Sequence, residues 1–394
     1  MTPLKINNFS HMKKGTTILA IILFITAGKG GCKQPDNQSD ELITVDVTAN
    51  YPKKELLLQD FMDVEYIPLE TNDEFITQGK VLEIGNKYIL VKNQINDGDL
   101  FIFDRETGKG IRKINRKGQG AEEYIRIDAV ALDEENNEIF VNCDTSGKIF
   151  VYDLSGNFKR ALAHGEGPQY LYIYNYDREN LIRYDDGKNK GIQSYHAIIS
   201  KQDGSITRDI PISFDKIKTP TLQMEGGLVF TYISSIIPYR ENWLLVEASS
   251  DTIYNYLSRE NKLIPFLVKT PSSTDPETFL TIGTLTDRFY FMQTIKMVFD
   301  PTAERGFPTT DLMYDKQENT LFRATVFNGD YLKKQKVDMI SNPVNGEIAA
   351  FQTLAASQLI EAYENNELKG KLKEIVVELD EDSNPVIMLM KYKK

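Results

Sequence analysis

Histidine, cysteine and tryptophan are nearly missing from this chain. Its 394 residues include three histidines, two cysteines and one tryptophan. Structural and catalytic zinc sites are built from clustered histidine and cysteine ligands, and no such cluster and no H-E-x-x-H pattern occurs. The G-x-S-x-G elbow of serine hydrolases is also absent. The sequence therefore predicts no metal site and no cofactor, and it nominates no catalytic residue.

The two cysteines, Cys32 and Cys143, lie far apart in the chain. Cys143 belongs to the apolar run "EIFVNCD" and is predicted to be a small buried side chain. If Cys32 is modified, as argued below, the folded part has no internal disulfide. Its stability must then come from a hydrophobic core, which a chain of this length can form.

Positive charge is scarce as well, and the formal net charge is −11. The first 31 residues contain four lysines and no acid, so the remainder has 42 basic and 57 acidic residues, a net charge of −15. A surface this negative repels phosphate backbones and disfavours nucleic acid as a partner.

The amino-terminal segment resembles a bacterial lipoprotein signal. Met12-Lys13-Lys14 precedes the apolar run "TILAIILFITA", which is too short to span a bilayer, and "GKGGC" then ends at Cys32. We expect residues 1–31 to be a signal peptide, with Met12 as the candidate true start, and residues 32–50 to be a lipidated cysteine and flexible tether. An ordinary secretory signal or an N-terminal anchor is the alternative, because Lys29 stands where lipoprotein signals have an apolar residue.

From Leu42 onwards, short apolar runs alternate with turn residues, which predicts an all-β body. Residues 99–124 and 147–172 repeat each other at an offset of 47 to 49, and the hairpin "AVALDEENNEIFVN" lies between the repeating parts. One repeat thus contains four strands, and its length is that of a propeller blade. Weaker copies follow at 196–212, 251–268 and 311–326.

The repeat length predicts a single domain over residues 51–394, a six-bladed β-propeller with four-stranded antiparallel blades. Its sixth blade is expected to pair a carboxy-terminal strand at 384–393 with residues 63–71, which closes the ring and removes free edges. The segment 351–379 has apolar residues at steps of three and four, and it predicts a short helical insertion.

Each repeat contains a G-x-G pair: Gly118 and Gly120, then Gly165 and Gly167. Phosphate-binding loops need further glycines or G-K-[ST], followed by a helix, and neither pair has them. Because the pairs recur at the blade period, we interpret them as turns between blades 1, 2 and 3, bends that favour positive φ. Tyr124 and Tyr170 are expected to pack beneath these turns.

The chain resembles the six-bladed β-propeller lipoproteins of Bacteroides-type bacteria, which are distantly NHL-like. The resemblance is carried by "INRKGQGAEEY", "AHGEGPQYL", "VEYIPLET" and "EDSNPVIMLMKYK", although Ala121 replaces the usual proline of the turn and Gln169 an acidic residue. It implies an exported lipoprotein of the outer membrane, facing the periplasm or the cell surface. The family has no generally assigned activity, so no catalytic residue is carried over.

The functional prediction is a non-catalytic binding or interaction module at the cell envelope, for a glycan or a partner protein. Propellers bind ligands through loops at the channel mouth, and 272–279 and 300–311 are the longest polar loops with proline. His164 and His196 are interpreted as rim or turn residues. A carbohydrate-active enzyme, a lyase or glycosidase using channel carboxylates, and a structural subunit of an outer-membrane complex remain the alternatives.

The signal predicts that the mature protein begins at a lipidated Cys32. Mass spectrometry of the native protein should find a diacylated amino-terminal cysteine and none of residues 1–31. An amino terminus downstream of Cys32 without acyl chains would contradict the prediction.

Overall fold

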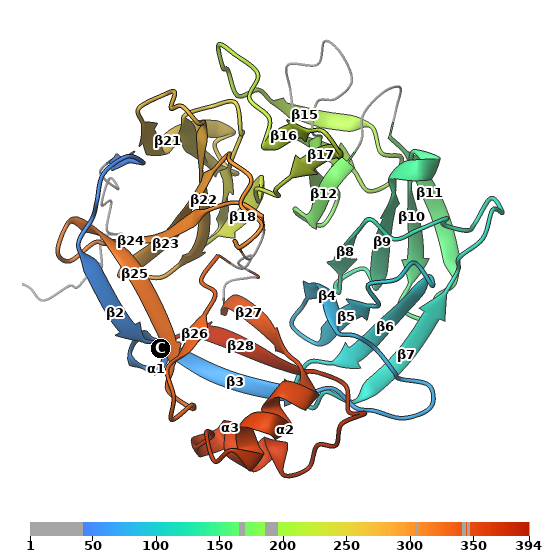
Figure 1. Ribbon diagram of the computed structural model, residues 1–394. Coiled ribbons are helices and arrows are strands. Elements are labelled where there is room, and N and C mark those ends of the chain that lie inside the picture. Colours follow the sequence, from blue (N-terminus) through green and yellow to red (C-terminus); the bar gives the residue numbers. More distant parts are fainter. Residues whose placement is uncertain are drawn as a thin grey trace, which may run out of the picture. The chain divides into compact units, whose positions relative to one another are not determined.

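Antiparallel sheets follow one another along the chain and are arranged around a common centre (Figure 1). The structure is a computed structural model that describes residues 42–164, 170–185, 196–303, 306–340, 344 and 347–393. Six of the seven described sheets are the blades of a six-bladed β-propeller, and the seventh is a two-stranded hairpin. In the first five blades the chain begins at the innermost strand and moves outwards by antiparallel pairing.

The first three blades are four-stranded meanders. Blade 1 contains β4 (Lys80–Ile84), β5 (Tyr88–Lys92), β6 (Asp99–Asp104) and β7 (Gly110–Asn115). Blade 2 contains β8 (Ala129–Asp133), β9 (Glu138–Cys143), β10 (Lys148–Asp153) and β11 (Phe158–Ala163), with the 3-10 turn η1 (Asp144–Ser146) after β9. Blade 3 contains β12 (Tyr170–Asn175), β13 (Asn180–Asp185), β14 (His196–Ser200) and β15 (Ile206–Ile210).

Blades 4 and 5 have four antiparallel strands and additional strands at their outer edges. Blade 4 contains β18 (Ile236–Tyr239), β19 (Asn242–Leu245), β20 (Thr252–Leu257) and β21 (Lys262–Thr270). Blade 5 contains β22 (Thr278–Leu285), β23 (Phe289–Lys296), β24 (Thr309–Asp315) and β25 (Thr320–Asn328), and β26 (Gln335–Val337) also pairs with β25. A separate hairpin of β16 (Thr221–Met224) and β17 (Gly227–Phe230) lies between blades 3 and 4 in sequence.

The two ends of the domain meet in blade 6, as the sequence predicts. Here β28 (Val386–Tyr392) pairs antiparallel with β3 (Met62–Pro68) over seven residue pairs, and β27 (Ile348–Leu354) pairs with the other side of β28. Three strands of blade 6 are described, in the order β27-β28-β3. The closing pair therefore joins residues more than 300 positions apart in the sequence.

The amino-terminal residues 43–68 form a strap along three consecutive blades, visible in blue in Figure 1. Strand β1 (Ile43–Asp46) adds to β21 in parallel, and β2 (Lys53–Leu57) adds to β25 in parallel. The short α1 (Leu58–Phe61) then leads into β3 of blade 6. The parallel additions and the three described strands of blade 6 are the departures from a uniform four-stranded pattern.

The helical insertion is present but starts later than expected. Helices α2 (Ala356–Glu364) and α3 (Gly370–Val376) connect β27 with β28, whereas residues 351–354 belong to β27. The apolar side chains of "FQTL" are compatible with the periodicity of a helix and with that of a strand. Antiparallel pairing with β28 makes this segment a strand. No helix in the described part of the chain is long and apolar enough to cross a membrane.

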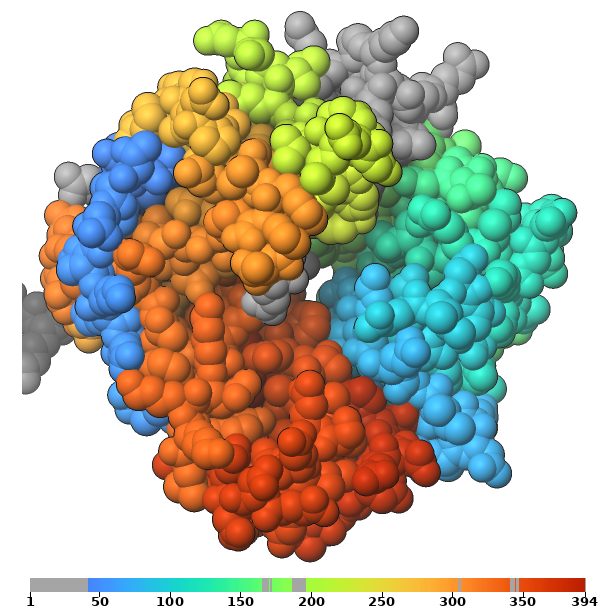
Figure 2. Space-filling view, viewed as in Figure 1, coloured from blue at the N-terminus to red at the C-terminus, as the bar shows by residue number. Residues whose placement is uncertain are grey.

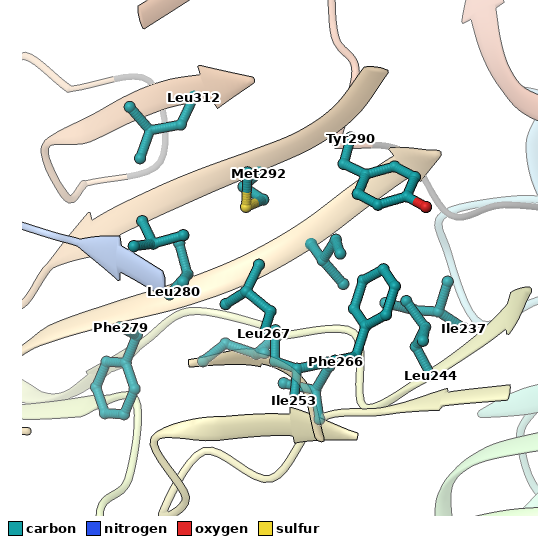
Figure 3. Packing of buried hydrophobic residues seen from close by; sticks show 14 of the residues in the cluster. Ile237, Leu244, Ile253, Phe266, Leu267, Phe279, Leu280, Tyr290, Met292 and Leu312 are labelled. Atoms are coloured by element: carbon teal, nitrogen blue, oxygen red, sulfur yellow. The ribbon is translucent and has the colours of Figure 1, made fainter. Parts of the chain in front are cut away.

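Hydrophobic side chains fill the spaces between neighbouring blades. Figure 3 shows the cluster between blades 4 and 5, where Phe266 and Leu267 meet Tyr290 and Met292. Cys143 is buried in the cluster between blades 1 and 2, as predicted. Burial of these apolar surfaces is the main stabilising contribution that holds each blade against the next.

The first G-x-G pair lies in the turn between blades 1 and 2, but for a different reason than the one expected. Neither Gly118 nor Gly120 has positive φ. A Cβ at Gly118 would lie 1.8 Å from Oε2 of Glu123, whose carboxylate folds back and accepts a hydrogen bond from the Gly120 amide at 2.9 Å. The glycine is needed to leave room for this side chain.

Tyr124 and Tyr170 are both fully buried, and Tyr124 packs beneath its turn as predicted, while the turn before Tyr170 lies outside the described residues. Tyr124 donates its hydroxyl hydrogen to the Gly98 carbonyl at 2.7 Å, and Tyr170 donates to the His164 carbonyl at 2.8 Å. Gly165 and Gly167 lie outside the described residues.

Because ring closure depends on β3, we expect Ile67→Ala to destabilise the fold. Ile67 is 2% exposed and packs between blades 6 and 1, so its truncation should lower the free energy of unfolding by about 2–4 kcal/mol. Ile206→Ala is the matched control, since Ile206 is 52% exposed and should change it by less than about 0.5 kcal/mol. Urea denaturation measures both, and equal effects would contradict the role of β3.

Candidate functional site

The innermost strands of the first five blades end at the same face of the ring, which we call the turn face because each of these strands turns there into its neighbour. The opposite face, where these strands begin, is called the loop face. The ends of β4, β8, β12 and β18 surround a cavity of about 350 Å³ at the turn face. We call this cavity the chamber. Its lining includes Glu83, Glu134, Tyr174, Tyr176, Arg178 and Trp243.

One wall of the chamber is aromatic. On β12, Ile173 packs towards blade 2, so Tyr174 lies on the opposite side, towards blade 4. There Trp243 of β19 approaches Tyr174 at a centroid distance of 6.1 Å and stacks on Tyr176 at 6.1 Å with 25° between the ring planes. The wall therefore offers flat apolar faces with polar edges, the kind of surface that amphipathic ligands contact.

Glu83, at the end of β4, supplies an unusual polar group to the chamber. Its partly buried position, together with repulsion from the Glu134 carboxylate, raises the pKa of Glu83 to about 8. Burial also raises the pKa of Tyr174 above that of an exposed tyrosine. At neutral pH both groups are protonated, so each can donate a hydrogen bond into the chamber.

Two further chamber acids are committed to the scaffold. The Glu134 carboxylate accepts hydrogen bonds from the amides of Asn86, Lys87 and Tyr88 at 2.9, 2.8 and 3.1 Å, which fixes the turn of blade 1 against blade 2. A Cβ on Gly85 would lie 2.3 Å from Glu134 Oε1, so this contact requires glycine at position 85.

Asp133 also has a structural partner. Burial alone would raise its pKa, but the ammonium of Lys201, which forms a buried ion pair with it, holds the pKa of Asp133 below its usual range. With Glu83 protonated and Asp133 paired, the chamber is less negative than its composition suggests.

Both histidines lie at strand ends, but they are buried and not at the rim as expected. His164 stacks on Tyr170 at 4.0 Å, and the guanidinium of Arg183 covers the same tyrosine at 4.5 Å. Arg183 in turn lies 3.8 Å from Asp185, and these side chains fill the space between blades 2 and 3. The cluster is a polar part of the interior.

His196 occupies the next inter-blade space, where its Nε2 lies 2.9 Å from the Ser235 carbonyl and its ring contacts Tyr184. Burial lowers the pKa of His196 to about 4, so it is neutral at physiological pH. The described residues contain no group of three or more His, Cys, Asp or Glu side chains arranged to hold a metal ion.

The loops predicted to bind a ligand lie at the loop face, away from the chamber. In 272–279, the ammonium of Lys269 contacts the Ser272 carbonyl at 3.2 Å and the Glu277 carboxylate at 3.2 Å, so this loop is anchored to blade 4. In 300–311, residues 304–305 are outside the described part, and Thr309–Asp315 is β24. A binding role for either loop stays a prediction.

Comparison with known proteins identifies relatives by fold. A family model described as a 6-bladed beta-propeller, DUF5128, matches residues 33–345. The sequence matches no curated protein. A crystal structure of a protein described as exported, from Bacteroides fragilis, is similar with a TM-score of 0.59 and 15% identity, covering 90% of this chain and 100% of that one. A member of the DUF4221 family from Bacteroides vulgatus has a TM-score of 0.45 and 10% identity over 85% of this chain and 98% of its own.

The raised pKa of Glu83 predicts a pH-dependent difference between the protein and its Glu83→Gln variant. The folded state holds the Glu83 proton up to about pH 8, whereas an unfolded glutamate releases it near pH 4.3. The contribution of Glu83 to the free energy of unfolding is therefore fully present below about pH 4.3. It is lost as the pH rises to 8, by up to roughly 1.4 kcal/mol per pH unit.

Glutamine cannot ionise, so Glu83→Gln should gain stability relative to the parent protein between pH 5 and pH 8. Urea midpoints at several pH values measure the gain. Glu135→Gln, an exposed position of the neighbouring turn, should leave the profile unchanged. If the urea midpoints of the parent protein and Glu83→Gln changed with pH in the same way, Glu83 would be ionised at neutral pH and the prediction would be wrong.

Proposed function

Because the chain belongs to the DUF5128 family of six-bladed β-propellers, whose model spans most of it, we propose that its function resides in the channel of the propeller. The protein is a binding module of the cell envelope, and its ligand is a glycan held in the chamber. The observation that carries this proposal is the pairing of an aromatic wall with protonated oxygen donors in one cavity.

A sugar ring has an apolar face of C–H groups and an edge of hydroxyls. The rings of Trp243 and Tyr176 can contact the apolar face of the sugar, because aromatic side chains provide a large apolar surface together with a polar edge. Glu83, Tyr174 and the guanidinium of Arg178 can donate hydrogen bonds to hydroxyl or ether oxygens at the rim. The cavity size is within the range of small-ligand pockets.

Charge favours a neutral glycan over a polyanionic one. Excluding the first 31 residues, the chain has a net charge of −15, and the chamber retains the carboxylates of Glu134 and Glu135. An anionic polymer approaching this surface would be repelled at low ionic strength.

The proposal includes the cellular location. Lipidated Cys32 would tether the propeller to the outer membrane through residues 33–41, and the family model begins at residue 33, directly after this cysteine.

One observation favours a second function, cleavage of the glycan. A carboxyl group with a pKa near 8 is suited to protonate a leaving-group oxygen, as general acids of glycosidases do. Suppose that the protein releases new reducing ends or unsaturated sugars and that Glu83→Gln does not. The function would then be that of a glycosidase or lyase and not that of a binding module.

Binding to a panel of neutral and acidic polysaccharides tests the proposal, with residues 33–394 as the protein and calorimetry as the measurement. We expect a neutral glycan to bind without turnover. Trp243→Ala and Tyr176→Ala should each weaken it roughly tenfold, the scale of one lost aromatic contact of about 1.4 kcal/mol.

Phe299→Ala is the control, because Phe299 is an aromatic residue in the 297–308 loop of the loop face, away from the chamber. Thermal melting confirms that each variant is folded. Binding that survives both chamber substitutions, or no binding to any glycan, would exclude the chamber as a glycan site.

A further inference from the structure

We propose that the glycan lies lengthwise along the channel, from the chamber at the turn face to the hairpin of β16 and β17 at the loop face. This inference rests on the proposed function and extends it: the ligand is a linear oligosaccharide, and the hairpin supplies a distant subsite. Three features of the described residues carry it.

The first feature is a row of tyrosines on the innermost strand β12. The sequence "YLYIYNY" places tyrosine at every second position from Tyr170 to Tyr176. Tyr172 and Tyr174 share the side of β12 that faces blade 4, and Tyr176 continues the row beyond the end of the strand. At about 3.3 Å per residue, the row from Tyr172 to Tyr176 extends roughly 13 Å along the channel.

The second feature is the hairpin at the loop-face end of this row. Its side chains Leu228, Phe230 and Tyr232 are 63%, 54% and 68% exposed, although Val229 between them packs towards the core of blades 4 and 5. Phe230 and Tyr232 contact each other edge to face at 5.2 Å. The hairpin is thus anchored on one side and presents aromatic rings on the other.

Tyr232 lies close to the tyrosine row. Burial raises the pKa of Tyr172 to about 12, and the nearby phenol of Tyr232 contributes to this rise. In Figure 1 the hairpin lies inside the ring of blades next to β12, and Figure 2 shows it, in yellow-green, beside the central opening. The aromatic residues therefore follow one another from Trp243 through the row to Tyr232.

The third feature is the exposed backbone of the innermost strands. Strands β4, β8 and β12 each pair only with the next strand outwards, so their inner edges leave amide and carbonyl groups facing the channel. These groups can bind sugar hydroxyls along the whole path, while the tyrosines contact the ring faces. A compact ligand would use one end of this surface, whereas a linear ligand uses all of it.

Affinity as a function of chain length tests the inference. For the glycan that binds in the panel, a series from monosaccharide to hexasaccharide should bind with increasing affinity and then reach a plateau. Tyr232→Ala should weaken the longest oligosaccharide about tenfold and leave the mono- and disaccharide unchanged. Trp243→Ala should weaken every member of the series.

Ile217→Ala is the control near the hairpin, because Ile217 is 65% exposed and has no aromatic ring. Tyr232 is exposed, so its substitution should leave the melting temperature unchanged. Equal affinity for all lengths, or equal loss at all lengths in Tyr232→Ala, would overturn the lengthwise arrangement while leaving a glycan site in the chamber. Tight binding of extended peptides in place of oligosaccharides would overturn both.

Discussion

The antiparallel pairing of β28 with β3 is the constraint on which the rest of the structure depends. A propeller has no layer of helices behind its sheets, so each blade is held by its two neighbours, and an open ring would expose two apolar blade surfaces and two strand edges. The strap of residues 43–68 strengthens the closure, because β1 and β2 add to blades 4 and 5 before β3 completes blade 6. The chamber exists only because this closure brings the inner strands of blades 1 to 4 and Val344 around one axis.

The same closure explains how the chamber acquires its chemistry. Glu83 and Trp243 are 160 positions apart in sequence, and Glu134 comes from a third blade. The Glu134 carboxylate binds the amides of the blade 1 turn directly after Glu83, so its negative charge is fixed beside the Glu83 carboxyl. One contact therefore joins blades 1 and 2 and disfavours ionisation of Glu83. Glycine at position 85 is a condition for this arrangement, since any side chain there would displace Glu134.

The fold could be predicted from the sequence because it depends on local, repeated patterns. The offset of 47 to 49 residues reflects four strands and their turns, and the apolar "VEYIPLET" and "NPVIMLMKYK" segments at the two ends need partners. The parallel additions of β1 and β2 were not predicted, because four or five alternating residues indicate a strand but not which distant strand it joins. The φ expected at Gly118 was wrong because the residue makes room for the Glu123 side chain, a contact that local pattern does not reveal. The histidines were misplaced for a similar reason, since aromatic stacking on Tyr170 and contact with Tyr184 allow polar rings to be buried.

The candidate site was largely hidden in the sequence, although one signal was present. The alternating tyrosines in "YLYIYNY" give β12 large side chains with polar hydroxyls, whereas another innermost strand, β8 with "AVALD", has small apolar ones before its terminal acid. Tyr172, Tyr174 and Tyr176 pack on the side of β12 that faces blade 4, whereas Tyr170, before a shift in register, packs between blades 2 and 3. Trp243 and Glu83 have no such pattern, and only the ring brings them to the end of that row. Repeated tyrosine in one inner strand is thus the part of the site that the sequence indicates, while the isolated polar groups of the chamber become visible only with the fold.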